Sequence, residues 1–288
     1  MTAQLEAPGL TADWLNGWLA AIGVTVLLPD VKLAWSDEGV PYAVFEHDRG
    51  AGDLPERLSA SMPDEGSLES SILADLPRRV TLEEFRSRSA DERRQRSLHL
   101  AASVSDLRFD ADQGNLDHGA FDPPGPGTVG ALWHRAVKCA AKIPSDERVE
   151  WITRSLAGEG TRVTVNGLGF DSRRLASGVR GNEASGANQA DPVVELLCFS
   201  SLALFPTRGD GRQIRQRGWR RSSTQDGSFT WVAWRPWLDR WAIDAFLDLD
   251  VGHRSYAGKD VIARYEVVPY RRKADADPTR AYFARRVR

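Results

Sequence analysis

The short segment DHGAFD offers the most compact set of groups in this chain that could hold a metal ion. Asp117, His118 and Asp122 supply two carboxylates and one imidazole, a donor set that suits a divalent cation in a metal-dependent hydrolase. No second histidine lies close in the sequence to complete such a site. A capped polar turn uses the same residue types, and we favour the turn while keeping the metal site as an alternative.

Two other side chains have types suited to acid–base chemistry. His134 lies in a predicted helix beside Trp133, where a histidine is more often hydrogen-bonded in or at the edge of a core than catalytic. Glu195 lies in an apolar helix, where a buried carboxyl can act as an acid or base, but its place in the first turn is also favoured by the helix dipole. The sequence contains no GxxxxGK[ST], HExxH, CxxC or GxSxG motif. We therefore predict neither an enzyme nor a cofactor.

The densest positive charge lies in the stretch GDGRQIRQRGWRRSSTQDGSFTWVAWRPW, residues 209–237. Together with the preceding Arg208 it provides the candidate nucleic-acid-binding residues Arg208, Arg212, Arg215, Arg217, Trp219, Arg220 and Arg221. We call residues 208–221 the arginine segment. Guanidinium groups pair with phosphates, and each phosphate neutralised releases counterions, so the segment predicts salt-sensitive binding, with Trp219 as a ring for base stacking. The alternative is a solvated loop that leads into a core strand.

The tryptophans that follow the arginine segment fit the periods of regular elements. FTWVAWR alternates like a strand, with Trp231 and Trp234 on opposite faces. RPWLDRWAIDAFLDL is typical of an amphipathic helix that starts at Pro236. We therefore predict that four tryptophans belong to the core: Trp231, Trp234, Trp237 and Trp241.

The charge is distributed unevenly along the chain. The formal net charge is −2, which predicts no general affinity for polyanions. Residues 206–288 carry 18 basic and 10 acidic residues, a net of +8, and residues 1–205 carry −10. This asymmetry indicates either an acidic scaffold with a basic contact region or a folded surface on which the charges mix. Only 5 of the 38 basic residues are lysines, a bias that a GC-rich genome explains without selection for phosphate contacts.

The cysteines and the N-terminal residues indicate in which cellular compartment the protein is expected. Cys139 and Cys198 lie in apolar helical patterns, which predicts buried free thiols in a reducing cytoplasm. The start, MTAQLEAPGL, lacks the basic region of a signal peptide. The apolar run Trp14–Leu28 contains Asn16 and is too short to span a bilayer. We expect a cytoplasmic protein that makes no membrane contact.

Periodicity and capping residues predict a helix-rich α+β fold with short antiparallel strands. The expected helices run from Thr11 to about Leu28, over residues 67–76 and 81–102, after Thr128, after Ser145, after Asp191-Pro192 and from Pro236. The expected strands are Val31–Trp35, Pro41–Glu46, Phe229–Arg235 and Val261–Lys273, and the stretch Thr161–Phe170 is expected to be a strand that leads into a glycine-bearing turn. An acidic, helix-rich region over residues 1–190 precedes a basic, tryptophan-rich region over residues 191–288. We favour one continuous unit over two domains.

Several stretches together resemble the CRISPR-associated proteins of type I-G (formerly I-U) operons, of the helicase-extension or large-subunit-like family. The stretches are GLTADWLNGWLAAIGVTVLLPDVKLAW, FDPPGPGTVGALWHRAVKC, RVTVNGLGFDSRRL, DPVVELLCFSSLALFP and RQRGW, and they span most of residues 9–250. The core helix of such proteins commonly carries a glycine where this chain has Ser200 and Ser201. The resemblance carries over no catalytic residue.

The resemblance implies a non-catalytic accessory or subunit of an RNA-guided interference complex. In such machines guide pairing supplies sequence specificity, while proteins hold backbones and displaced strands. The implied partners are other CRISPR effector subunits or the helicase-nuclease, and guide RNA or target DNA. Two alternatives stay open: a structural adaptor whose basic region docks on an acidic protein partner, and the metal-dependent hydrolase of Asp117, His118 and Asp122.

Overall fold

The computed structural model describes residues 2–64, 66, 80–94, 109–110, 115–116, 129–164, 189–209, 214–220, 228–248, 260–271 and 280–287. The helices are α1 (Leu15–Leu27), η1 (Arg49–Ala51), α2 (Leu54–Ser61), α4 (Leu82–Arg94), α6 (Val129–Ala140), α7 (Arg148–Ala157), α9 (Pro192–Ser201), η4 (Leu202–Leu204) and α10 (Arg240–Asp248). The longer strands are β1 (Thr2–Thr11), β2 (Lys32–Trp35), β3 (Tyr42–Asp48), β11 (Ser228–Trp234), β12 (Val261–Arg271) and β13 (Arg280–Val287). The short strands are β4 (Phe109–Asp110), β5 (Asn115–Leu116), β6 (Val163–Thr164), β7 (Gln189–Ala190), β8 (Thr207–Gly209), β9 (Ile214–Gln216) and β10 (Trp219–Arg220).

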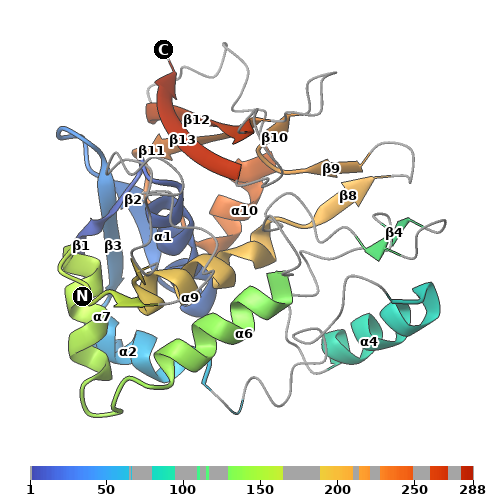
Figure 1. Ribbon diagram of the computed structural model, residues 1–288. Coiled ribbons are helices and arrows are strands. Elements are labelled where there is room, and N and C mark those ends of the chain that lie inside the picture. Colours follow the sequence, from blue (N-terminus) through green and yellow to red (C-terminus); the bar gives the residue numbers. More distant parts are fainter. Residues whose placement is uncertain are drawn as a thin grey trace.

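Helices α1 and α9 lie together at the centre of the molecule (Figure 1). Both are apolar nearly all round, and every residue of α9 is buried, as expected for helices that no solvent reaches. Their backbones meet at Gly23, where a Cβ would overlap the carbonyl oxygen of Leu197. Only glycine permits this approach. The hydroxyls of Ser200 and Ser201 donate to the carbonyls of Leu196 and Cys198, so α9 continues through the serines without a glycine.

A three-stranded antiparallel sheet in the order β1-β3-β2 covers one side of α1. Strands β2 and β3 pair with Leu33 opposite Phe45, which confirms the predicted pair of strands. The predicted opening of helix, strand, strand is wrong at its start, because β1 precedes the helix and pairs with β3 along nearly its whole length. Residues 2–11 contain Pro8 and Gly9 and few β-branched residues, so their extended conformation depends on the partner strand more than on local preference.

The second sheet is antiparallel in the order β10-β11-β12-β13. Strand β11 is buried on both faces and lies near the centre, as its apolar sequence predicts. A backbone bridge between Leu33 of β2 and Leu238 links the first sheet to the segment between β11 and α10, with N···O distances of 2.8 and 3.0 Å. The two sheets therefore belong to one connected framework, and one hydrophobic cluster extends from Ala7 to Tyr265.

Trp18 of α1 joins the two ends of the chain. Its ring centroid lies 5.9 to 6.4 Å from those of Phe205, Phe229, Trp231 and Trp234, and its indole N–H donates to the carbonyl of Val232 at 2.9 Å. Trp231 and Trp234 therefore both lie beside Trp18. The register shift between Ala233 and Trp234 leaves Ile262 as the extra residue of β12.

The α+β class with antiparallel strands is confirmed, and so are most of the predicted helices. Asp191 caps α9 as expected, since its Oδ1 accepts from the amides of Val193 and Val194 at 2.9 and 3.3 Å. Helix α7 begins after Glu147 and not at a Ser145 cap. Helix α10 begins at Arg240, since residues 236–239 are not helical. The carboxylate of Asp239 accepts from the amide of Ala242.

Both cysteines are free; Cys198 is buried and Cys139 is half-buried. Burial raises the pKa of the Cys139 thiol, against the opposing effect of Lys142. In the part of the chain that the structure describes, no helix combines the length and the apolar character that crossing a membrane requires.

The close backbone contact at Gly23 predicts that a larger residue there destabilises the protein. Gly23→Ala is expected to lower the free energy of unfolding by about 3 kcal/mol, because the added methyl collides with backbone that cannot move without separating α1 from α9. Urea denaturation measures the loss. Gly50→Ala is the matched control, since a Cβ there has no neighbour closer than 3.6 Å, and it should change stability by less than about 0.5 kcal/mol. Equal effects of the two substitutions would refute the close contact.

Candidate nucleic-acid interface

Much of the arginine segment is β structure and not an irregular loop. Strands β8 and β9 form a small antiparallel hairpin, and β10 joins the edge of the second sheet by pairing with β11. In Figure 1 the hairpin extends to the right of the central helices, away from α7 and the first sheet. Arg212 and Arg221 lie outside the described residues, and Arg208, Arg215, Trp219 and Arg220 are placed by their backbone only.

The register of the hairpin brings two of the predicted arginines together. Arg208 is directly opposite Arg215, with Thr207 opposite Gln216 on one side and Gly209 opposite Ile214 on the other. Residues directly opposite one another in an antiparallel pair share a face, and like charges in that position destabilise the pair. The register therefore places two residues of like charge directly opposite one another in the hairpin.

Arg217 holds the segment to the body of the protein. Its Nε and Nη2 donate to the two carboxylate oxygens of Asp248, both at 2.7 Å, and its Nη1 donates to Asp244 and, at 2.7 Å, to the carbonyl of Leu204. The arginine side chain is only 5% exposed, while those of Asp244 and Asp248 are 41% and 46% exposed. One guanidinium thereby joins three elements: the turn before β10, helix α10 and the end of η4.

This arrangement corrects the prediction for Arg217. Burial acts to lower its pKa, but the hydrogen bonds to Asp248 and Asp244 outweigh burial, so the pKa is raised and the side chain stays charged. Its donors are engaged within the protein, and it is not a phosphate contact. The signal for this role was the spacing of Asp244 and Asp248, which puts two carboxylates on one face of the predicted helix, although the sequence does not say which arginine they bind.

The residue after Arg217 completes the anchor. Gly218 has a φ of 74°, in the left-handed region that favours glycine, and a Cβ there would collide with the ring of Phe229. Its carbonyl accepts from the amide of Thr230 at 2.8 Å. Because Phe229 contacts Trp18, the turn between β9 and β10 packs directly on the aromatic core. The RQRGW stretch thus fixes where the hairpin leaves the body of the protein.

The exposure of one tryptophan differs from the prediction. Trp231 and Trp234 are buried as expected, and Trp237 is half-buried. Trp241 is 65% exposed, so its assignment to the core is wrong. The helix starts at Arg240, four residues later than predicted, and the buried side of α10 is set by Ile243. The guanidinium carbon of Arg240 lies 5.0 Å from the centroid of the Trp241 ring.

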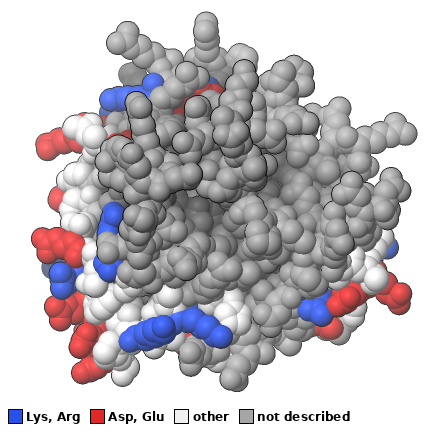
Figure 2. Space-filling view, viewed as in Figure 1, with Lys and Arg blue, Asp and Glu red and all other residues white. Residues whose placement is uncertain are grey.

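Many of the described acidic side chains lie far from the hairpin. On the face shown in Figure 2, Asp and Glu side chains collect along the left margin, over the region of α7 and the first sheet, with a few Lys and Arg side chains between them. The hairpin lies on the other side in the same view. Acidic side chains also appear at the lower right of Figure 2, and the partly exposed Asp244 and Asp248 lie at the base of the hairpin, where they bind Arg217.

The other candidate groups are placed as follows. Asp117, His118 and Asp122 lie outside the described residues, and no three metal-ligating side chains come together among those that are described. His134 is half-buried on α6. Glu195 is fully buried and its Oε1 accepts from Asn16 Nδ2 at 3.1 Å, which makes it a polar contact between α1 and α9 at a position closed to substrate.

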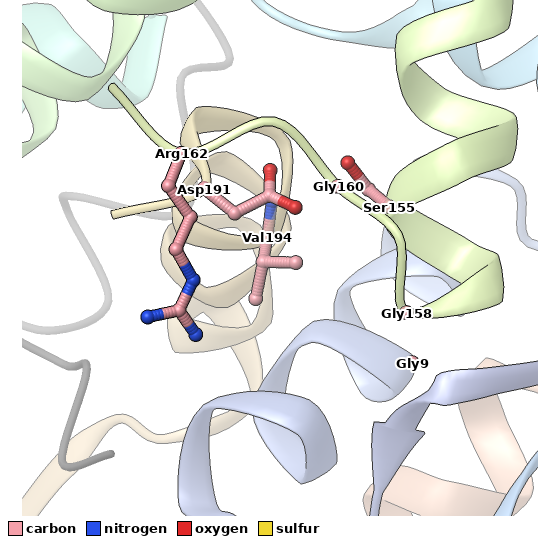
Figure 3. A pocket seen from close by; sticks show the side chains of 7 residues that line it. All are labelled: Gly9, Ser155, Gly158, Gly160, Arg162, Asp191 and Val194. Atoms are coloured by element: carbon pink, nitrogen blue, oxygen red, sulfur yellow. The ribbon is translucent and has the colours of Figure 1, made fainter. Parts of the chain in front are cut away.

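A small hollow lies where the end of α7 meets the start of α9 (Figure 3). It is lined by Gly9, Ser155, Gly158, Gly160, Arg162, Asp191 and Val194. In Figure 3 the carboxylate of Asp191 points toward Gly160, where a side chain would overlap it. The hollow measures about 30 Å³, enough for one or two water molecules. Its size suits the hydration of a helix cap and excludes a metabolite.

In comparisons with family models, with curated proteins and with solved structures, nothing matched this chain.

The geometry around Arg217 predicts a folding role that can be measured. Removing one partner of a fully buried ion pair costs about 3–5 kcal/mol of stability. Because Asp244 and Asp248 are partly exposed, water screens part of this interaction. Arg217→Ala should therefore lower the free energy of unfolding by about 2 kcal/mol. Arg217→Lys should recover only part of it, because an ammonium cannot reproduce the planar, bidentate geometry. Urea denaturation with Arg154→Ala as an exposed control tests this; a stable Arg217→Ala variant would contradict the anchor.

Proposed function

We propose that this chain is a non-catalytic accessory or subunit of a type I CRISPR interference complex that contacts nucleic-acid backbone through the arginine segment. The pairing of Arg208 with Arg215 is the observation that carries the proposal, because two positively charged residues directly opposite one another destabilise a hairpin unless an anion offsets their charge. The resemblance to type I-G proteins supports the choice of complex. Nuclease and helicase activity would belong to a partner.

The anchor supports the same proposal. Binding is stronger when the contacting groups are ordered before the ligand arrives, since less conformational entropy is lost. Arg217 and Gly218 hold the base of the hairpin against α10 and Phe229, so the strands leave the protein in a defined direction. The segment's remaining candidates for phosphate contact are Arg208, Arg212, Arg215, Arg220 and Arg221.

The double variant Arg208→Ala/Arg215→Ala tests the proposal. Each phosphate contact on single-stranded nucleic acid contributes about 0.7 to the slope of log K against log salt, so the variant should bind more weakly at low salt with a slope reduced by about 1.4. The folded protein should be no less stable than the wild type, because the substitution relieves a like-charge pair. Filter binding or fluorescence anisotropy with a single-stranded oligonucleotide at several salt concentrations measures both affinity and slope.

The matched control is Arg148→Ala/Arg154→Ala, which removes the same charge from α7 on the other side of the molecule. It should leave the slope nearly unchanged. If both double variants change binding equally, the effect is one of net charge and the hairpin is not the contact. If the wild type has no affinity for free nucleic acid but still co-purifies with effector subunits after nuclease treatment, the adaptor function replaces the proposal.

The hydrolase alternative has its own test. We expect protein purified without added metal to contain well below one equivalent of bound divalent ion, and Asp117→Ala/Asp122→Ala to leave nucleic-acid affinity unchanged, because neither carboxylate takes part in the proposed contact. Elemental analysis and a phosphodiesterase assay provide the measurements. A stoichiometric metal that the double variant loses, together with hydrolysis by the wild type, would favour the hydrolase.

A further inference from the structure

Trp241 is the most exposed large hydrophobic side chain in the part of the chain that the structure describes. It is 65% exposed, and Val40 at 49% is the other side chain of this kind. The other tryptophans whose burial is described are buried or half-buried. An indole in water contributes little to folding, and tryptophan is among the residues most enriched where proteins bind one another. The ring therefore marks a candidate interface.

The ring shares one side of α10 with two carboxylates. The positions three, four and seven residues after Trp241 lie on its side of the helix, and they hold Asp244, Ala245 and Asp248. The side chains of Asp244 and Asp248 are 41% and 46% exposed, and Ala245 is small and exposed. Ile243 is buried and turns the opposite side of the helix to the core. We call the side that holds the indole and the two carboxylates the α10 face.

The described charges beside the ring have a negative sum. Asp239, Asp244 and Asp248 contribute three negative charges, and Arg217 and Arg240 contribute two positive ones. Both guanidinium groups are engaged, Arg217 by two of these carboxylates and Arg240 by the ring itself. Carboxylates that are nearly half exposed can accept further donors. The α10 face therefore favours a cationic ligand and disfavours a phosphate backbone.

The ring itself accepts a guanidinium group. The Cζ of Arg240 lies 5.0 Å from the centroid of the Trp241 ring, within the distance of about 6 Å at which a cation is attracted to an aromatic face. An indole has two faces, so the face that Arg240 does not occupy can accept a second cation. An arginine has an aliphatic stem and a flat guanidinium group, so it can cover aromatic surface while it pairs with a carboxylate.

We propose that the α10 face docks a basic segment of a partner protein, with an arginine of that segment stacked on Trp241 and bonded to Asp244 or Asp248. The contact uses both features of the face, an open aromatic surface and a negative charge. It does not rest on nucleic-acid binding, and its charge is opposite to that of the arginine segment. A subunit with both contacts binds nucleic acid at the arginine segment and a neighbouring protein at α10.

The test observes the Trp241 ring directly. Protein labelled with 5-fluorotryptophan gives fluorine NMR signals from its tryptophans, and the signal that Trp241→Phe removes belongs to Trp241. The probes are a short peptide of alternating glycine and arginine and the same peptide with citrulline, the uncharged isostere of arginine. We expect the arginine peptide to shift the Trp241 signal saturably. The citrulline peptide should bind at least about fivefold more weakly, because it lacks the charge for the cation–π and carboxylate contacts.

Ala245→Arg places a positive charge on the α10 face and keeps the ring available for observation. It should weaken binding of the arginine peptide about tenfold, because like charges then face one another. Val40→Arg is the matched control, since it adds the same charge at another exposed apolar position, and it should leave the affinity nearly unchanged.

Three results overturn the inference. The first is a Trp241 signal that the arginine peptide does not move. The second is an equal response to the citrulline peptide, because charge would then not select the ligand. The third is an equal loss of affinity in Ala245→Arg and Val40→Arg, because the effect would then be one of net charge. A shift with oligothymidylate and none with the arginine peptide assigns the ring to nucleic acid instead.

Discussion

The burial of α1 on all sides is the constraint from which the rest of the structure follows. A helix that no solvent reaches must find apolar partners around its whole circumference and a bond for each polar group it carries. Gly23 allows α9 to approach on one side, and Trp18 reaches the aromatic residues of β11 on another. Asn16, which would be costly if buried alone, donates to Glu195 of α9. The first sheet covers one side of α1, and the hydrogen bonds of Asn16 and Trp18 reach residues 179 and 214 positions later in the chain.

Indole N–H groups reinforce this long-range assembly. Trp18 donates to Val232, Trp231 donates to the carbonyl of Ala12 at 2.6 Å, and Trp234 donates to Leu33 at 3.1 Å. Each bond crosses from the first part of the chain to the last and satisfies a donor that burial would otherwise leave unpaired. The acidic first region and the basic second region share a core. The arginine segment is fixed to that core where Gly218 packs against Phe229, which in turn contacts Trp18.

Local signals predicted the elements whose ends are set by their own residues. Asp191 and Pro192 predicted the start of α9. The sequence did not predict the elements that depend on distant partners. Strand β1 pairs with β3, and the turn between β9 and β10 is held by contacts of Arg217 with α10 and of Gly218 with Phe229. For the candidate site, the sequence indicated the charge of the segment. It did not indicate which arginine is neutralised internally, because that depends on how α10 packs.

The internal neutralisation of Arg217 limits what the arginine segment can do electrostatically. Counted along the chain, residues 208–221 hold six arginines and one aspartate. Arg217 is bound by two carboxylates of α10, so this group of three side chains carries one net negative charge and detracts from the positive field around it. At most five arginines of the segment remain for phosphates, which limits their contribution to the salt slope to about 3.5 on single strands. Composition alone overstates the charge of an arginine-rich stretch whenever one of its members anchors the stretch to the fold.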